Sequence, residues 1–301
     1  MTSEITLLVN PTAGRGRGAR AAQPAAAALR AAGYTVRSVV GVDAEDALTR
    51  ARQAVAAGTG ALVAVGGDGM TSLALQAVAG TDTPLGVVAV GTGNDFARAC
   101  GLPLRDPAAA GRLIADALKG NRVHSLDLGQ VGDRYFGTVL ASGFDSRVND
   151  RGNRMRWPTG RLRYDVAMLL ELAGLHTVRY RLRLDDGPWQ EVDATLVAVG
   201  NGPSYGGGMR MCAGAQLTDG RFDVTVVGPC SRTTLLRVFP RVFSGTHLDH
   251  PAVTVHRAAR VTLEADGVTG YADGEPLGPL PLTARTVPRA VRVLAPAQPD
   301  G

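Results

Sequence analysis

Two glycine-rich turns in the first third of the chain restrict its fold more than any other feature. The sequence Gly-Gly-Asp-Gly at 66–69 follows the apolar run 61–65, and Gly-Thr-Gly-Asn-Asp at 91–95 follows the apolar run 85–90. Both runs predict buried parallel strands, and the residues after each turn predict a helix. Each turn is therefore expected at the carboxyl end of a strand.

Such turns suit a ligand that carries phosphate. Glycine lets the backbone approach a ligand without a Cβ atom in the way, and the N–H groups that open the next helix form an anion site. Asp68 and Asp95 lie in the same turns, and a carboxylate beside phosphate needs a cation between them. The two turns together predict a metal-bound nucleotide, although either turn alone could be an ordinary strand-to-helix connection.

Two familiar phosphate-binding motifs are excluded. A P-loop needs a lysine directly after its last glycine, and Lys119, the only lysine of the chain, is far from any glycine-rich turn. The dinucleotide fingerprint G-x-G-x-x-G is met only in part after the first strand, because the third glycine falls at Gly18, one position too early after Gly14 and Gly16.

Five motifs in this order resemble the diacylglycerol kinase catalytic family, in its branch of soluble bacterial lipid kinases. They are Asn10-Pro11-Thr12-Ala13-Gly14, the turns at 66–69 and 91–97, Asp219-Gly220-Arg221-Phe222-Asp223-Val224, and Asp273-Gly274-Glu275-Pro276. The sphingosine kinase and NAD kinase families are related. The resemblance implies an α/β nucleotide-binding domain, a β-sandwich domain for a lipid substrate, and an active site in the cleft between them. It also implies transfer of phosphate from ATP, with Mg²⁺, to a lipid hydroxyl, most of all that of diacylglycerol, giving phosphatidic acid.

The resemblance assigns roles to individual residues. Glu275 is expected to be the general base that accepts the proton of the lipid hydroxyl, and Arg98 and Arg15 to lie near the transferring phosphate. The residues expected to bind or orient magnesium are Asp68, Asp95 and Asp127. The residues expected to bind the nucleotide are Asn10, Pro11, Thr12, Ala13, Gly14, Gly66, Gly67, Asp68, Gly69, Met70, Thr71, Gly91, Thr92, Gly93 and Asn94. Plain structural roles compete: a solvated turn glutamate at 275, and surface arginines that cap a helix or a loop.

A second, structural metal is expected at Gln216, Asp219 and Arg221, where backbone carbonyls could supply ligands beside the carboxylate. An ordinary Asp-Gly hairpin turn is the competing explanation. Two positions depart from the family pattern. Met70 stands where a threonine is usual, and Gly41 stands where the family carries another threonine, so one nucleotide contact at each position is in doubt.

The pattern of strand and helix signals changes once along the chain. Up to about Leu118, apolar runs alternate with Ala-rich helical stretches, which predicts a parallel sheet between helix layers. After Asp127, short strand-like runs separated by Gly, Asp and Pro turns predict an antiparallel β-sandwich. These runs are 134–141, 178–184, 194–199, 222–227, 253–256 and 260–265. The domains are thus expected to be 1–126, to which 288–301 returns, and 127–287.

Length and charge are compatible with two such domains and an anionic partner. The chain of 301 residues is long enough for two cores, and its formal charge of +5 rests almost wholly on arginine. No RRM or zinc-finger signature is present, so membrane headgroups are a better partner than nucleic acid. Residues 147–175 combine arginines around Trp157 with the apolar run 166–172, which predicts a membrane contact. A solvated basic loop before a core helix is the alternative.

Cysteine usage and the N-terminal sequence indicate the cytoplasm. Cys100, Cys212 and Cys230 are widely spaced with no C-x-x-C pair, as is typical of thiols in a reducing compartment. The chain enters the strand-like run 5–9 without a signal segment, and no apolar run is long enough to span a bilayer. We expect a cytoplasmic enzyme that reaches its lipid peripherally, at the inner membrane surface.

Two other functions stay open from the sequence. A kinase of a soluble substrate such as NAD would share the Gly-Gly-Asp-Gly turn, but the run 91–97 argues against it. A catalytically silent nucleotide- or lipid-binding protein would explain Met70 and Gly41. The presence together of four acidic residues argues against that: Asp68, Asp95, Asp127 and Glu275. Oligomeric state is equally open, and a homodimer is one of the options.

Overall fold

A computed structural model describes residues 3–9, 17–144, 146–148, 151, 155, 171 and 177–296. The chain divides into two compact units, 1–128 with 288–301, and 129–287. The sequence placed the first boundary two residues earlier, after residue 126, and the second at the same place.

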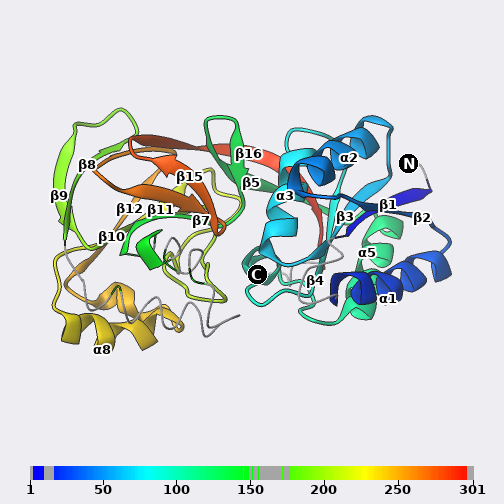
Figure 1. The fold of residues 1–301 in the computed structure, drawn as a ribbon, viewed down its shortest axis with the longest axis horizontal. Coiled ribbons are helices and arrows are strands. Elements are labelled where there is room, and N and C mark those ends of the chain that lie inside the picture. The colour runs from blue at the N-terminus through cyan, green and yellow to red at the C-terminus, as the bar shows by residue number, and fades with distance from the viewer. Residues whose placement is uncertain are drawn as a thin grey trace. The chain divides into compact units, whose positions relative to one another are not determined.

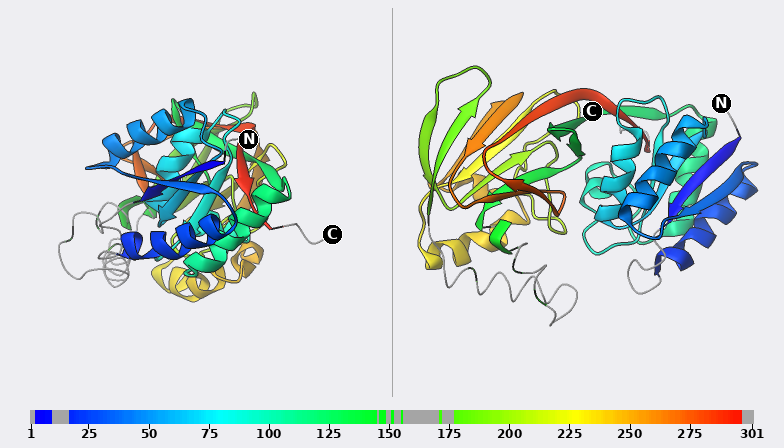
Figure 2. Two further views of the ribbon diagram at one scale, coloured as in Figure 1. Left: turned by 90° about the vertical axis from the view of Figure 1, so that its right-hand side faces the viewer. Right: turned by 45° about the horizontal axis from the view of Figure 1, so that its top comes forward.

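The first unit is a parallel sheet between two helix layers (Figures 1 and 2). Its strands run in the order β2-β1-β3-β4, and the end of β16 joins β4 in parallel through Val293 and Leu85. Helices α1 and α5 lie side by side on one face, and α2 and α3 lie on the other. The elements are β1 Glu4–Val9, α1 Arg17–Ala31, β2 Thr35–Val40, α2 Ala44–Ala56, β3 Ala61–Gly66, α3 Asp68–Val78, β4 Leu85–Ala89, α4 Asp95–Ala99, α5 Pro107–Lys119, β5 Val123–Val131 and β16 Leu282–Leu294.

Local sequence explains these elements. Every residue of β3 and β4 is buried, because helices cover both faces of the sheet, and this is why the two runs lack polar alternation. Asp43 caps α2 by accepting a hydrogen bond from Asp46 N at 2.8 Å. Asp106 caps α5 in the same way, with Pro107 in the first turn, where its missing N–H costs nothing.

The second unit is an antiparallel β-sandwich. One sheet has six strands in the order β12-β11-β10-β7-β14-β15, and β9, β8, β13 and the first part of β16 pair in the other. Phe136, Tyr180 and Phe222 are fully buried between the sheets, and the rings of Phe136 and Phe222 stack with centroids 5.8 Å apart. The elements are β6 Arg134–Phe136, β7 Val139–Gly143, β8 Val178–Leu184, β9 Gln190–Ala194, β10 Leu196–Gly200, β11 Phe222–Val227, α8 Arg232–Val242, the 3₁₀ helix η1 Thr246–Asp249, β12 Val253–Ala258, β13 Arg260–Glu264, β14 Thr269–Ala272 and β15 Glu275–Pro279.

Two expected strands are each divided in the structure. The run 134–141 splits into β6 and β7, because the N–H groups of Gly137 and Thr138 donate to the Asp273 carboxylate at 2.7 and 2.9 Å instead of to a neighbouring strand. The run 194–199 divides at Thr195 between β9 and β10. Among the described residues, no helix has both the length and the apolar character needed to cross a membrane.

A buried histidine is expected to make the stability of the second unit fall in acid. His247 in η1 is 1% exposed, its Nε2 lies 3.2 Å from Met211 O, and its Nδ1 has no partner among the described residues. Burial lowers the pKa of His247, and the Met211 carbonyl opposes this shift only in part. The unfolded state therefore binds the proton more tightly, so stability is lost as the pH falls below the unfolded pKa of about 6.5.

Replacement of His247 is expected to reduce the loss of stability at low pH. Thermal unfolding of the parent should shift to lower temperature between pH 7 and pH 5 (roughly the range around the unfolded pKa), and His247→Gln should shift less. Equal shifts in the two proteins would show that protonation of His247 does not couple to unfolding.

Candidate active site

The two glycine turns are in backbone contact at the carboxyl ends of β3 and β4. These strands are parallel neighbours, and Val90 N donates to Gly66 O at 2.8 Å just beyond them. A Cβ atom built on Gly91 would lie 2.5 Å from Gly67 Cα, and one built on Gly67 would lie 3.1 Å from Gly91 Cα. Neither glycine can therefore be exchanged for a larger residue without separating the turns.

Asp68 ties the first turn to the second. Its Oδ1 accepts a hydrogen bond from Asp95 N at 2.7 Å, and its Oδ2 accepts one from Asn94 N at 2.8 Å. Asn94 has a left-handed backbone, φ 58°, and its side chain bonds both the N–H and the carbonyl of Gly91 at 2.9 Å. The sequence predicted Asn94 as a nucleotide contact, whereas in the structure its side chain holds the loop together.

The turns leave backbone donors unused. The N–H groups of Asp68 and Gly69 open α3, and those of Thr92 and Gly93 lie in the second turn; none has a hydrogen-bond partner among the described residues. Free N–H groups at a helix start and in an adjacent turn are the donors that bind phosphate oxygens. These four N–H groups are thus available to a ligand, and their part in nucleotide binding stays a prediction.

Two carboxylates converge beside Gly93. A Cβ atom on Gly93 would collide with Asp68 Oδ2 and would lie 3.2 Å from Asp95 Oδ2. Two like charges so close to one point favour a cation that lies between them. The donor set of carboxylate oxygens fits Mg²⁺, which prefers hard oxygen ligands and retains water.

Asp127 is held by a different contact of the first unit. It is 3% exposed in β5, and its Oδ1 accepts a hydrogen bond from Arg289 N at 2.8 Å, where the backbone of Arg289 is left-handed with φ 53°. Within the described part of the chain, no group of three or more Asp, Glu, His or Cys residues could hold a metal ion. Asp127 therefore does not join Asp68 and Asp95 in a cluster of three carboxylates.

Other residues assigned to this site take structural positions. Met70 is buried, its Cβ packs against Gly66, and its N–H donates to Gly67 O at 3.1 Å. The Thr71 hydroxyl donates to Gly67 O at 3.3 Å. Arg98 is exposed on α4, and its guanidinium donates to Gly93 O at 3.2 Å, which leaves other N–H groups for a phosphate.

Some predicted residues lie outside the described part of the chain. These are Arg15 and the motif 10–14, and most of the segment 147–175. In that segment the structure shows Arg147 and Arg151 in ion pairs with the buried Glu171, at 3.4 and 2.5 Å. Two of the arginines that the sequence assigned to membrane headgroups are thus already bound to a carboxylate.

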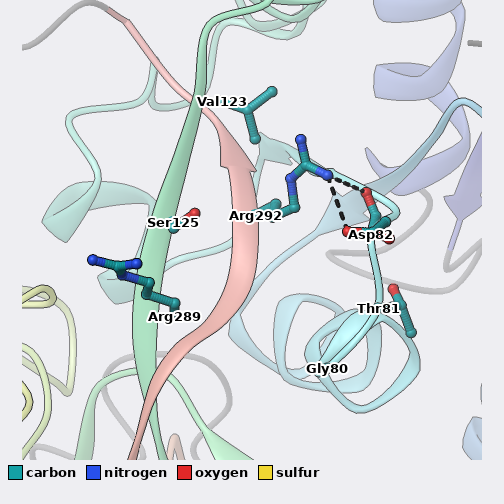
Figure 3. A pocket seen from close by; sticks show the side chains of 7 residues that line it. All are labelled: Gly80, Thr81, Asp82, Val123, Ser125, Arg289 and Arg292. Atoms are coloured by element: carbon teal, nitrogen blue, oxygen red, sulfur yellow. Dashed lines mark hydrogen bonds and ion pairs between the residues drawn. The ribbon is translucent and has the colours of Figure 1, made fainter.

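A polar pocket of about 450 Å³ lies elsewhere in the first unit (Figure 3). Its lining comprises Gly80, Thr81, Asp82, Val123, Ser125, Arg289 and Arg292. Arg292 donates to the carboxylate and the carbonyl of Asp82 at 3.3 and 3.2 Å. The lining contains none of the residues predicted to bind nucleotide, so the pocket adds no group to the candidate site.

Glu275 belongs to the second unit and follows a tight turn. Asp273 and Gly274, with φ 49° and 85°, connect β14 to β15, and Glu275 opens β15 opposite Ala272. The Asp273 carboxylate fixes this turn through its hydrogen bonds to the N–H groups before β7. Glu275 itself is exposed, and its role as general base stays a prediction.

Asp219, the carboxylate of the expected structural metal site, forms an ion pair with an arginine. Asp219 Oδ1 accepts from Arg221 N at 3.0 Å, and its Oδ2 pairs with the Arg257 guanidinium. Arg257 also lies 3.3 Å from Asp223, opposite it in the β11–β12 register. Burial raises the pKa of Asp223, and Arg257 opposes the shift. The Arg257 guanidinium already compensates both carboxylates, so the expected ligand set, which also includes Gln216, fits a metal ion poorly. The second metal stays a prediction, and this ion pair argues against it.

Replacement of Gly91 by alanine is expected to disrupt the nucleotide site. The new Cβ would meet Gly67 Cα at 2.5 Å and Asn94 Oδ1 at 2.9 Å, so strain should lower the free energy of unfolding by about 1–3 kcal/mol and abolish ATP binding. Gly228→Ala is the control, because the backbone of Gly228 is not left-handed and a Cβ atom there would meet only Ala252 O at 3.5 Å, an ordinary contact. Chemical denaturation and calorimetric titration with ATP measure both effects. A Gly91→Ala protein with the stability and ATP affinity of the control would contradict the contact.

Comparison with known proteins assigns both units. The sequence profile described as "Diacylglycerol kinase catalytic domain" matches residues 4–131, and that described as "YegS C-terminal NAD kinase beta sandwich-like domain" matches residues 138–295. A diacylglycerol kinase of Mycobacterium tuberculosis is 46% identical over 298 residues, which cover 97% of this chain and 95% of that protein. The chain belongs to the diacylglycerol kinase family. It is accordingly a lipid kinase.

Further relatives agree with this family and its fold. A probable YegS-like lipid kinase of Serratia proteamaculans is 31% identical over 299 residues, covering 96% of this chain and 93% of that one. A crystal structure of a putative diacylglycerol kinase from Bacillus anthracis has a TM-score of 0.80 at 21% identity, covering 98% and 96% of the two chains. An ATP complex of an NAD kinase from Archaeoglobus fulgidus has a TM-score of 0.55 at 12% identity, covering 97% and 93%. The fold is therefore shared with NAD kinases, and the sequence identity favours lipid kinases.

Proposed function

We propose that this lipid kinase transfers the γ-phosphate of ATP to the hydroxyl of diacylglycerol and produces phosphatidic acid. The observation that carries the proposal is the pair of interlocked turns, whose unpartnered N–H groups and converging carboxylates form a site for a metal-bound polyphosphate. Diacylglycerol is the substrate named for the Mycobacterium tuberculosis relative, and its 46% identity to this chain supports the same choice here.

In this proposal each group of the chain has one task. The N–H groups of Asp68, Gly69, Thr92 and Gly93 bind phosphate oxygens, and Arg98 adds positive charge near them. Asp68 and Asp95 hold Mg²⁺, which when bound neutralises charge on the phosphates. Glu275 accepts the proton of the lipid hydroxyl while the hydroxyl oxygen attacks the γ-phosphorus, and ADP departs. Because the acceptor is a lipid, the enzyme would work as a peripheral protein at the inner membrane surface.

Transfer of label from ATP tests the proposal. The purified protein is incubated with Mg²⁺ and γ-labelled ATP against mixed micelles of diacylglycerol, sphingosine, ceramide or phosphatidylglycerol, and against NAD in solution. We expect label in diacylglycerol and none when the metal is removed by a chelator. Label in another lipid would support lipid kinase activity but would assign a different substrate. Label in NAD alone would overturn the proposal.

A further inference from the structure

Helix α8 of the second unit buries little of its apolar surface. It runs from Arg232 to Val242, and Val242 is the one residue of the helix that is buried. Leu236 is 53% exposed, and Phe243, directly after the helix, is 41% exposed. Figures 1 and 2 show α8 at the periphery of this unit. Large exposed apolar side chains that gather on one element mark an interaction surface.

The apolar residues on one side of α8 form a stripe. Leu236 and Phe243 are exposed and Phe239 between them is half-buried. The three follow each other at spacings of three and four residues, so they lie on one face of the helix. The rings of Phe239 and Phe243 meet edge to face with centroids 6.0 Å apart. Leu235 and Val242 point to another side, where they pack against the outer face of the six-stranded sheet. The stripe is therefore not the face that attaches α8 to its own unit.

All charged residues of α8 are basic. The helix carries Arg232, Arg237 and Arg241 and no aspartate or glutamate. In the described part of the chain, Arg232 and Arg237 have no hydrogen-bond or ion-pair partner, and Arg241 donates to Thr246 O. No carboxylate among the described residues compensates these charges, so the helix complements an anionic surface.

We propose that α8 is the element through which this protein docks on an anionic phospholipid bilayer, with Leu236, Phe239 and Phe243 inserted among the acyl chains and Arg232 and Arg237 on the headgroups. This inference rests on the proposed function, because a kinase of diacylglycerol must reach a substrate that resides in a membrane. An apolar stripe bordered by arginines is the pattern of a helix that lies in the membrane interface. The arginine segment predicted from sequence is a different region, in which Arg147 and Arg151 are already paired with Glu171.

Sedimentation with vesicles tests the docking helix without any need for catalysis. The vesicles are phosphatidylcholine alone and a mixture of phosphatidylcholine with phosphatidylglycerol, and no ATP is added. We expect the parent to bind the mixed vesicles and to bind phosphatidylcholine much more weakly. The double variant Arg232→Gln/Arg237→Gln should bind the mixed vesicles about 30-fold more weakly, since each arginine contributes about 5-fold. The double variant Leu236→Gln/Phe243→Gln should lose at least about 10-fold.

Two control variants carry matched changes in the first unit. Arg52→Gln/Arg112→Gln removes the same charge from exposed positions of α2 and α5, and Val42→Gln replaces a residue that is 88% exposed. Both should bind vesicles within about 2-fold of the parent, a change smaller than the loss of one docking arginine. Thermal unfolding of every variant checks that the exposed substitutions leave the fold intact.

The outcomes separate this inference from the proposed function. A short-chain diacylglycerol in detergent micelles reports kinase activity without a bilayer, and the α8 variants should phosphorylate it as the parent does. Vesicle binding that depends on α8, without lipid phosphorylation, would overturn the function and keep the docking helix. Phosphorylation with equal vesicle binding by parent and α8 variants would overturn the docking helix. A third outcome is a dimer in analytical ultracentrifugation that the Leu236→Gln/Phe243→Gln change dissociates, together with no vesicle binding by the parent. This outcome would assign the stripe to contact with a second copy of the chain and would overturn the docking helix as well.

Discussion

Replacement of Glu275 by glutamine is expected to lower kcat for lipid phosphorylation by about 10²- to 10⁴-fold, the usual contribution of a general base. Glutamine keeps the size of the side chain and cannot accept a proton from the lipid hydroxyl. KM for ATP should stay the same, because the N–H groups that we assign to the phosphates lie in the turns of the first unit. Steady-state kinetics with γ-labelled ATP and diacylglycerol micelles measure both quantities.

The control is Glu191→Gln in the same unit. Glu191 is an exposed strand residue, paired with Arg179 at 2.9 Å, and we assign it no part in catalysis. Its replacement should leave kcat unchanged. If Glu275→Gln and Glu191→Gln have the same kcat, Glu275 is a solvated residue of the β14–β15 hairpin and another group accepts the proton.

Replacement of Asp68 by alanine is expected to lower the free energy of unfolding and to abolish nucleotide binding. The carboxylate accepts hydrogen bonds from Asn94 N at 2.8 Å and Asp95 N at 2.7 Å, and both N–H groups would lose their partner. The free energy of unfolding should fall by about 2–4 kcal/mol. Without this link the second turn is no longer held against the first, so ATP should fail to bind. Chemical denaturation and calorimetric titration measure the two effects.

Asp116→Ala and Asp68→Asn complete this comparison. Asp116 is exposed on α5 with no side-chain partner within the described ranges, so its loss should change stability by less than about 0.5 kcal/mol. Asp68→Asn retains one carbonyl oxygen and should lose about half as much stability as Asp68→Ala. If Asp68→Ala were as stable as Asp116→Ala, backbone contact alone would hold the turns together.

Most of the architecture was readable from the sequence. The continuous apolar runs at 61–65 and 85–90 predicted buried strands, and the structure has the fully buried strands β3 and β4 there, with Val90 just beyond β4 and half-buried. Alternating strand and helix signals predicted the α/β unit, and short runs between turns predicted the sandwich. The division of the run 134–141 arose because a distant side chain, that of Asp273, accepts the backbone hydrogen bonds of Gly137 and Thr138. No local pattern could show a contact across 135 residues.

The sequence predicted which residues lie at the candidate site better than it predicted what each side chain does there. The glycine turns and their two aspartates were predicted together and are found together, because both turns end neighbouring parallel strands. The same pattern gave no sign that Asn94 holds the loop through Gly91, or that Arg289 fixes Asp127. The left-handed backbone of Arg289 has no local sequence signal, since tertiary contacts stabilise it, whereas asparagine adopts this conformation readily.

The sequence by itself determined the two fold classes, the glycine turns and the family motifs, since periodicity and turn chemistry are local properties of the chain. Only the tertiary structure decided which N–H groups remain free for phosphate, which carboxylates converge, and that Arg257 already neutralises Asp219. It also decided that α8 leaves an apolar stripe uncovered. The physical reason is the same in each case: burial, hydrogen-bond satisfaction and charge pairing depend on residues that are far apart in sequence and meet only when the chain folds.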